Sequence, residues 1–520
     1  MSRKINSLKN FQSSIISEII SIVLKFITRS IFIAILGTEY LGISSLATNI
    51  LSMLSLSEMG FGAAITFHLY KPLADGDINK LKSILGFFSR IYKYIGFIIS
   101  IPGILLIPFL SFFIKDDVGS INVKLIFAFY LFQTVSSYFF YGYKHSVIRA
   151  NQKEYIISIT KSYFSILNSI LQIAILLITK DFYFYVLITV LSNVLMNMSI
   201  ARKADKLYGY LRDKNVPEIE REEKIRIFKD AYAIFFYKIY DKVLNSTDTI
   251  IISKYIGLTM LGIYSNYLMI LNTLQIFLSK FYTSILASLS DLYAREENER
   301  SYMLFKTINL ITTFTFGFFA ITINNTINTF IILWIGPKYT LNESFVVLFS
   351  ILILLNGYRV FFDTFRTSMG LFQKAKYRPI FGAIINISLS LIFVRIFGIS
   401  GVLLATVIAN CLTYMWYDPY IILKFGFSKG ITIFLVDNFK YLLSLIGSAF
   451  LVKLAISFFE LNGLVEIIVN IALSMVFMIL TFGLLYFKTE EFKFLQSTSS
   501  TIIKSIWTKI LKKTNLNRTI

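Results

Sequence analysis

Hydrophobic residues in this chain come in runs of roughly twenty or more, separated by short polar segments. About twenty helical residues are enough to cross a hydrocarbon core ~30 Å thick. The alternating segments of about ten residues that build a membrane β-barrel do not occur in the pattern. The pattern therefore predicts an all-α polytopic membrane protein. About fourteen transmembrane helices are expected, at residues 13–36, 41–67, 91–114, 122–145, 155–179, 183–201, 230–256, 261–287, 304–335, 344–370, 379–397, 400–423, 438–459 and 463–487.

The first span and the turn after it recur later in the chain. The segment Glu18–Ile43 ends in Leu41-Gly42-Ile43, and about 220 residues further on the chain reads Leu261-Gly262-Ile263. Further matches follow in the same order: Gly37 with Gly257, Gln152-Lys153 with Gln373-Lys374, and L-x-T-V-x-x-N at Leu187–Asn193 and again at Leu404–Asn410. We infer a duplication of six helices. Because six is even, the two copies have the same orientation in the membrane.

The repeat also predicts the domain organisation. Residues 1–201 form an N-terminal six-helix lobe and residues 230–424 a C-terminal six-helix lobe. Residues 202–229 are rich in charges of both signs and are expected to be a cytoplasmic linker. Two additional transmembrane helices occupy residues 425–487, and a basic amphipathic tail covers residues 488–520.

Charge placement predicts the topology. The net charge is +21, and about 36 of the 51 Lys and Arg lie at the two ends of the chain or in every second loop. This distribution is the positive-inside signature, so both termini are expected in the cytoplasm and the charge does not indicate a nucleic-acid partner. The single Cys411 excludes a disulfide within the chain.

Two segments are amphipathic. Asp77–Tyr92 and the tail around Ile502–Lys513 place apolar residues at helical spacing opposite lysines. Both are expected to lie along the cytoplasmic membrane surface and to attract anionic lipids, with a partner protein as the alternative.

A dozen charged residues fall within predicted spans, where each costs about 2.5–3.5 kcal/mol at the helix centre if it faces lipid. Most must therefore face one another or a water-filled interior. On the first span, Glu18, Lys25 and Arg29 share one helical face. By the repeat, Arg29 and Asp248 fall at almost equal depth. The remaining charges of this kind are Glu58, Lys238, Asp241, Lys242, Lys280, Arg359, Asp363 and Arg366.

Two interpretations of these charges stay open. Lys238 or Lys242 can pair with Asp241, and Arg359 or Arg366 with Asp363. Lys25 and Arg29 have no close local acid, which favours an anionic ligand such as phosphate. The candidate substrate-binding cations are Lys25, Arg29, Lys238, Lys242 and Arg359, and the candidates for ion coupling or charge pairing are Glu18, Glu58, His68, Asp241, Asp248 and Asp363.

Motifs for catalysis are missing. The chain has no GxxxxGK[ST] phosphate loop, no HExxH and no GxSxG elbow, and it holds only two histidines. We expect no enzyme activity, no metal and no cofactor, so a gradient, the membrane potential or consumption of the substrate must supply the energy for any transport.

The second span resembles a known signature. Leu56–Ala64 (LSEMGFGAA), followed by His68–Asp77 (HLYKPLADGD), resembles the second helix of bacterial polysaccharide flippases of the Wzx type, and Gly37–Gly42 is also similar. These flippases belong to the multidrug/oligosaccharidyl-lipid/polysaccharide exporter superfamily. The resemblance covers roughly residues 10–100.

The resemblance implies two six-helix lobes in a V around a central cavity that work by alternating access. The implied substrate is an undecaprenyl-diphosphate-linked oligosaccharide, moved from the inner to the outer leaflet of the bacterial cytoplasmic membrane for capsule, O-antigen or related surface polymers. Lys25 and Arg29 match the cationic first helix of such proteins. Implied partners are membrane lipids, a polysaccharide polymerase and assembly proteins. The alternatives are a peptidoglycan-precursor flippase, a multidrug exporter, and, from another class, a membrane polysaccharide polymerase or ligase.

Overall fold

The computed structural model of the chain describes residues 3–58, 61–116, 119, 121–139, 142–213, 216–294 and 298–497. Within this part of the chain the secondary structure is entirely helical, as the hydrophobic pattern predicts. Two compact units can be distinguished, Met1–Thr273 with Ala383–Val402, and Leu274–Gly382 with Leu403–Ile520. These units differ from the lobes that the sequence repeat predicts, and those lobes remain a prediction.

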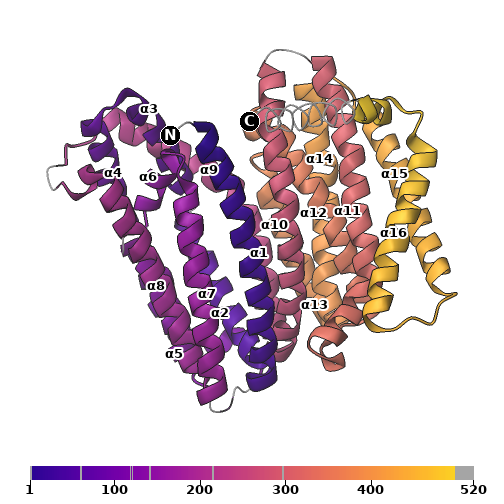
Figure 1. Cartoon of the computed structure of the whole chain (residues 1–520), viewed down its shortest axis with the longest axis horizontal. Coiled ribbons are helices and arrows are strands. Elements are labelled where there is room, and N and C mark those ends of the chain that lie inside the picture. Colours follow the sequence, from indigo (N-terminus) through magenta and orange to yellow (C-terminus); the bar gives the residue numbers. More distant parts are fainter. Residues whose placement is uncertain are drawn as a thin grey trace, which may run out of the picture. The chain divides into compact units, whose positions relative to one another are not determined.

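The first unit is a bundle of long helices that lie side by side (Figure 1). Helix α1 packs along α7, α7 along α8, and α8 along α5, while α2 and α3 pack against α9. The helices are α1 (Arg3–Leu36), α2 (Glu39–Leu54), α3 (Phe61–Asp75), α4 (Ile78–Leu106), α5 (Val123–Phe139), α6 (Lys144–Ala150), α7 (Glu154–Thr179), α8 (Phe182–Leu207) and α9 (Arg221–Tyr255), with α10 (Leu258–Ala294) beginning in this unit.

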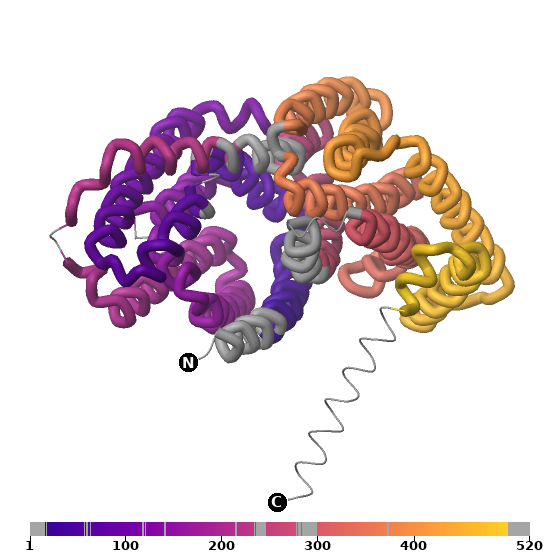
Figure 2. Tube along the Cα trace, turned by 90° about the horizontal axis from the view of Figure 1, so that it is seen from above, coloured from indigo at the N-terminus to yellow at the C-terminus, as the bar shows by residue number. Residues whose placement is uncertain are grey.

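The second unit is organised around α11, which packs against α12 and α16. Figure 2 shows the helices of each unit nearly end-on. Apolar side chains of α11, α15 and α16, including Leu310, Tyr441 and Phe482, form one buried cluster. The helices are α11 (Asn298–Trp334), α12 (Glu343–Ser368), α13 (Arg378–Leu412), α14 (Tyr414–Ile421), α15 (Thr432–Ile456) and α16 (Gly463–Tyr486). Helix α13 is broken at Gly398, and its residues 383–402 belong to the first unit.

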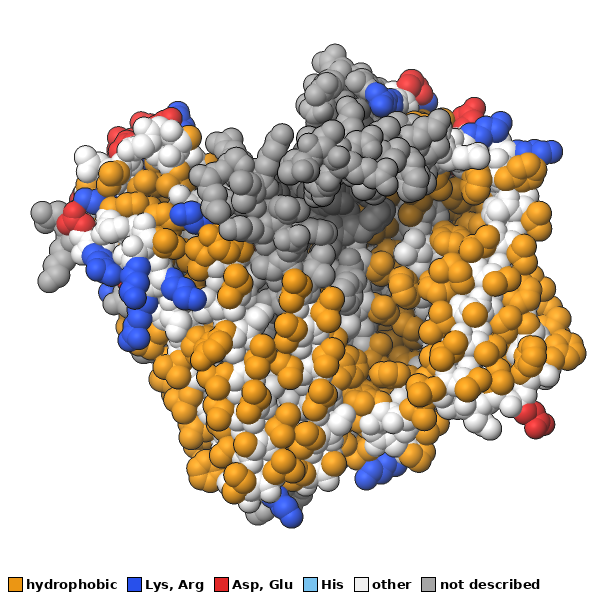
Figure 3. Space-filling view, viewed as in Figure 1, with side chains coloured by type: hydrophobic (Ala, Val, Ile, Leu, Met, Phe, Trp, Pro, Cys, Tyr) orange, Lys and Arg blue, Asp and Glu red, His pale blue; other side chains and the backbone are white. Residues whose placement is uncertain are grey.

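Nine helices in the described part of the chain are long and apolar enough to cross a membrane, or ten if the bent pair α5 and α6 forms one span. Fewer spans meet this criterion than the fourteen expected. Helices α2 and α3 have only 16 and 15 residues, and Arg378–Gly426 counts once although two spans are expected there. On the visible face, hydrophobic side chains cover the body of each unit and Lys and Arg collect toward its ends (Figure 3).

Five predicted short loops contain a residue with left-handed backbone. These residues are Gly37, Lys180, Gly257, Gly398 and Gly463, with φ between 53° and 133°. A positive φ reverses the chain direction within a few residues and is least strained at glycine. The recurring glycine after the first helix of each repeat is therefore needed for the backbone to turn.

The structure corrects two boundary predictions. The expected span 41–67 is interrupted by a 3₁₀ turn at Ser55–Glu58. The segment Asp77–Tyr92 is the first part of α4, which runs to Leu106 without a break. Its apolar face, including Ile84 and Phe88, is buried in the protein. The periodicity located this face correctly, but protein rather than lipid covers it. The tail around Ile502–Lys513 lies outside the described residues.

The repeated Leu-Gly-Ile motif marks a reciprocal contact within the first unit. A β-carbon on Gly42 would lie 2.0 Å from the carbonyl oxygen of Leu258, and one on Gly262 would lie 1.8 Å from the carbonyl oxygen of Thr38. Gly42 is four residues after Thr38, and Gly262 is four residues after Leu258. Each glycine therefore contacts the residue that lies one helical turn before the other glycine. Small residues allow helix backbones to come this close in membranes, so the starts of α2 and α10 cross at their glycines.

We predict that Gly42→Ala and Gly262→Ala each prevent correct folding, because the obstructing atoms are backbone and cannot rotate away. The measurement is the yield of monodisperse protein after extraction in mild detergent. Gly447→Ala and Gly483→Ala are matched controls on helices α15 and α16, where a β-carbon would meet no atom within 4 Å. The controls should keep the wild-type yield, and an equal yield for all four variants would show that the crossing tolerates a side chain.

Candidate functional site: cations of the membrane helices

Helix α1 carries two cations one turn apart. Lys25 is exposed and Arg29 is partly buried. Neither makes an ion pair with any residue that the structure describes. Glu18, the acid nearest in sequence, lies within electrostatic reach of Lys161 on α7 instead. Neither cation therefore has an acidic partner among the described residues, and their role in binding a substrate remains a prediction.

Arg29 is held by hydroxyl groups. Its Nη1 atom donates to Ser265 Oγ on α10 at 3.1 Å, and Ser265 Oγ donates in turn to the carbonyl oxygen of Gly262 at 2.7 Å. Tyr130 and Tyr185 lie close enough to act electrostatically on the guanidinium. Hydroxyl oxygens solvate a cation but do not neutralise it, so the positive charge of Arg29 remains available to an anion.

Aromatic packing fixes how α1 presents this arginine. Phe32, three residues after Arg29, is buried and packs edge-on against Phe182 and Tyr185 of α8, at centroid distances of 5.8 and 4.8 Å. Tyr130 donates to Ser44 on α2 at 3.1 Å. The rings around Arg29 are thus locked by their own contacts, and the guanidinium is held in one orientation.

Asp248 does not pair with Arg29. It is buried on α9 and lies near Tyr264, whereas the hydrogen bond of Arg29 goes to Ser265, the next residue along α10. The equal depth that the repeat predicts for Arg29 and Asp248 does not lead to an ion pair.

Glu58 and His68 each have a partner on another helix. Tyr138 donates to Glu58 Oε2 at 2.5 Å. His68 Nε2 lies 2.9 Å from Asp230 Oδ2, with side chains 12% and 47% exposed. Asp230 is on α9, 162 residues away in sequence, so sequence spacing could not identify this partner. Ion coupling at Glu58 or His68 remains a prediction.

The second unit pairs its buried charges. Arg366 Nη1 lies 3.0 Å from Asp418 Oδ1, and Arg378 Nη1 lies 2.5 Å from Asp418 Oδ2. Arg366 also contacts Asp363, which is the pairing that the spacing on span ten offers. Arg359 is partly buried on the same helix. Asp418 and Arg378 could not be predicted from local spacing, because Asp418 lies 52 residues from Arg366 and 40 residues from Arg378.

The first unit contains a counterpart of this pair. Lys144 Nζ donates to both carboxylate oxygens of Asp205 at 2.7 and 2.8 Å, between the start of α6 and the end of α8. Arg366 and Asp418 likewise connect the end of α12 to α14. In both, a carboxylate neutralises a buried cation and ties two helix ends together.

Three predicted site residues, Lys238, Asp241 and Lys242, have side chains outside the described ones. Among the residues that are described, no group of three or more His, Cys, Asp or Glu could hold a metal ion.

Comparison with known proteins gives the class of protein. Residues 7–293 match the family described as polysaccharide biosynthesis protein. This match covers more than half of the chain, so the chain belongs to that family. The resemblance seen in Leu56–Ala64 and His68–Asp77 to Wzx-type polysaccharide flippases is thereby confirmed at the level of the family. A comparison with curated proteins gives no match.

The fold is shared with solved transporters. The lipid II flippase MurJ in an inward closed conformation matches with TM-score 0.64 at 15% identity, over 90% of this chain and 98% of that one. An inward-facing multidrug resistance MATE family transporter of the MOP superfamily matches with TM-score 0.60 at 15% identity, over 77% and 94%. A MOP superfamily transporter from Pyrococcus furiosus, described by a reversed polarity of its binding pocket, matches with TM-score 0.52 at 15% identity, over 80% and 95%.

We predict that Asp418→Asn destabilises the protein by about 3–5 kcal/mol, because it leaves Arg366 and Arg378 buried without their shared counter-charge. The measurement is thermal unfolding of the purified protein in detergent. Asp363→Asn is the matched control. Its carboxylate is 26% exposed and contacts only one of the two arginines, so its effect should be clearly smaller. Equal effects of the two substitutions would contradict a special role for Asp418.

Proposed function

We propose that this protein is a flippase that moves a diphosphate-linked lipid oligosaccharide from the inner to the outer leaflet of the bacterial cytoplasmic membrane, for assembly of a surface polysaccharide. Membership of the polysaccharide biosynthesis family supports the product class. The fold shared with a protein described as a lipid II flippase supports transport of a lipid-linked substrate rather than catalysis.

The observation that carries the proposal is the environment of Arg29. Buried cations elsewhere in the described chain, Lys144, Arg366 and Arg378, each contact a carboxylate. Arg29 lies on a membrane-spanning helix and contacts a hydroxyl instead. A cation at such a position is costly unless an anion neutralises it. A guanidinium binds phosphate oxygens in bidentate geometry, which suits a diphosphate head group.

Lys25 provides a second charge for the same ligand. It lies four residues before Arg29, so the two side chains emerge from the same face of α1 about one turn apart. Lys25 is exposed and makes no ion pair with a described residue. A diphosphate presents two phosphoryl groups. Two cations about one turn apart suit these two groups better than they suit a single carboxylate.

Transport also needs a source of energy. With the cell interior negative, each net negative charge moved outward gains about 2.3 kcal/mol per 100 mV. If the cations of α1 move with the substrate, this gain decreases and coupling to an ion gradient becomes necessary. In the proposed mechanism Glu58 and His68 are the candidates for that coupling, and the transport follows alternating access without a chemical step.

Two alternatives follow from the same fold. The name of the structural neighbour suggests lipid II as substrate, and the MATE transporters suggest a multidrug exporter. The family match favours a polysaccharide intermediate over both. The cationic face of α1 also argues against a cationic drug, which would need acidic residues.

We predict that Arg29→Gln removes surface polysaccharide from cells that depend on this protein, while the amount of protein in the membrane stays the same. The measurement is polymer on the cell surface together with immunodetection of the protein in the membrane fraction. Arg395→Gln is a matched control. It also removes a guanidinium from a membrane helix, but Arg395 is exposed. Its Cζ atom lies 5.5 Å from the centroid of the Tyr255 ring. Normal polymer in the Arg29 variant would exclude this residue from transport.

The proposed topology places both termini in the cytoplasm. In a Cys411→Ser background, we predict that a cysteine at Glu220, in the segment before α9, reacts with a thiol reagent only after the membrane is opened. A cysteine at Asn462, in the loop before α16, should react in intact cells. Both positions are exposed, so burial does not decide the outcome, and the opposite labelling pattern would reverse the topology.

A further inference from the structure

The segment between α8 and α9 is attached to the first part of α4. Lys82 Nζ lies 2.5 Å from Asp213 Oδ2, and Lys80 Nζ lies 3.2 Å from Glu223 Oε2. Val216 packs closely on Gly86 of α4. A β-carbon on Gly86 would lie 2.3 Å from Val216 Cγ1. One ion pair and one close apolar contact therefore hold this segment, and the second ion pair holds the first turn of α9.

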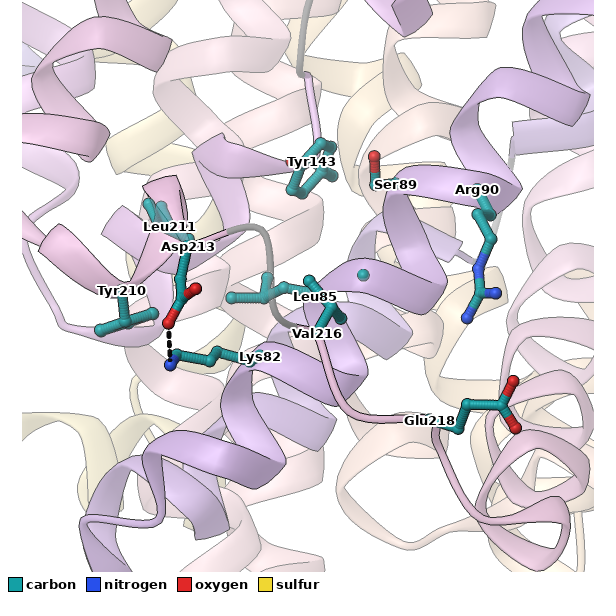
Figure 4. Close-up of a pocket in the computed structure, with 11 residues that line it drawn as sticks. Lys82, Leu85, Ser89, Arg90, Tyr143, Tyr210, Leu211, Asp213, Val216 and Glu218 are labelled. Carbon is teal, nitrogen blue, oxygen red and sulfur yellow. Dashed lines mark hydrogen bonds and ion pairs between the residues drawn. The ribbon is translucent and has the colours of Figure 1, made fainter.

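A pocket of about 410 Å³ lies between α4 and this segment. Lys82, Ser89 and Arg90 line it from α4, and Tyr210, Asp213 and Glu218 line it from the segment. Figure 4 shows the Lys82–Asp213 pair on one side and, on the other, Arg90 extending from α4 toward the side on which Glu218 lies. The volume falls within the range of small-molecule sites, about 300–1,000 Å³.

Two hydrogen-bond donors in this pocket lack acceptors. Arg90 makes no hydrogen bond or ion pair with a described residue. The hydroxyl of Tyr210 is buried and likewise has no described partner. Burial raises the pKa of Tyr210 to about 12, so this hydroxyl keeps its proton at neutral pH and can donate it to an acceptor on a ligand. A buried hydroxyl without a partner is unfavourable, whereas the guanidinium of Arg90 is exposed and accessible to a ligand.

The charges of the lining residues narrow the ligand further. A guanidinium without a partner favours a phosphoryl group, to which it can donate two hydrogen bonds. Arg90 is eight residues after Lys82, about 12 Å along the helix, so one phosphate cannot contact both. Glu218 and Asp213 can accept hydrogen bonds from hydroxyl groups. Such a pocket suits a ligand with a phosphoryl group at one end and hydroxyl groups at the other.

We propose that this pocket binds a phosphorylated polyol, with the phosphoryl group on Arg90 and the hydroxyl groups near Asp213, on the other side of the pocket. Such a ligand comes from one of two sources, a soluble sugar phosphate or the head group of a phospholipid such as phosphatidylglycerol. Bound there, it contacts both α4 and the segment before α9, and it therefore stabilises their attachment. The site is separate from the cations of α1 and does not depend on the proposed transport.

The test uses the full-length protein, purified in phosphate-free buffer and mild detergent. Thermal unfolding is followed with glucose 1-phosphate, and the phospholipid that copurifies is quantified. We expect glucose 1-phosphate to raise the unfolding temperature in a saturable way, as a ligand of the folded state does, or phosphatidylglycerol to copurify at a fixed ratio. The first result identifies a soluble source and the second a lipid source.

Arg90→Gln should weaken the binding of glucose 1-phosphate at least tenfold, or remove the copurified phosphatidylglycerol. Lys93→Gln is the matched control, since it removes one positive charge from the same helix three residues further on, outside the pocket lining. Ser89→Trp, which fills the pocket without changing charge, should also abolish binding. The proposal is wrong if neither probe binds the wild type, or if Arg90→Gln and Lys93→Gln bind equally well.

Discussion

The cost of a charged side chain inside a membrane is the constraint on which this structure depends. Within the described chain this cost is met in two ways. Lys144 pairs with Asp205 in the first unit, and Arg366 and Arg378 share Asp418 in the second unit. Arg29 is partly buried and differs from these cations, because a serine and two tyrosines lie near it instead of a carboxylate. The paired charges connect helix ends, and we propose that Arg29, which has no carboxylate partner among the described residues, is available to a ligand.

The Leu-Gly-Ile motif that occurs twice in the sequence connects the packing of the first unit to the candidate site. Two helix starts approach each other reciprocally at Gly42 and Gly262, and Ser265, one turn after Gly262, is the residue that contacts Arg29. The same turn of α10 therefore makes the backbone crossing and positions the guanidinium. A change at this crossing would alter both the packing of the unit and the orientation of the proposed substrate-binding group.

Much of this organisation can be predicted from the sequence. The apolar runs predict the helical membrane fold, the Leu-Gly-Ile repeat predicts the duplication, and the spacing of Lys25 and Arg29 from Glu18 predicts cations without a local acid. The partners of buried charges could not be predicted, since Lys144 and Asp205 lie 61 residues apart and His68 and Asp230 lie 162 apart. Periodicity also identifies the apolar face of Asp77–Tyr92, but it does not show whether lipid or protein covers that face.

The central claim is that Arg29 binds the anionic head group of a lipid-linked oligosaccharide during its transfer between leaflets. Its most direct test is the purified protein reconstituted in liposomes, with the transfer of an undecaprenyl-diphosphate-linked oligosaccharide from one leaflet to the other measured over time. The account predicts transfer that depends on the wild-type protein and is lost with Arg29→Gln. No transfer by the wild type, or equal transfer by the variant, would contradict it.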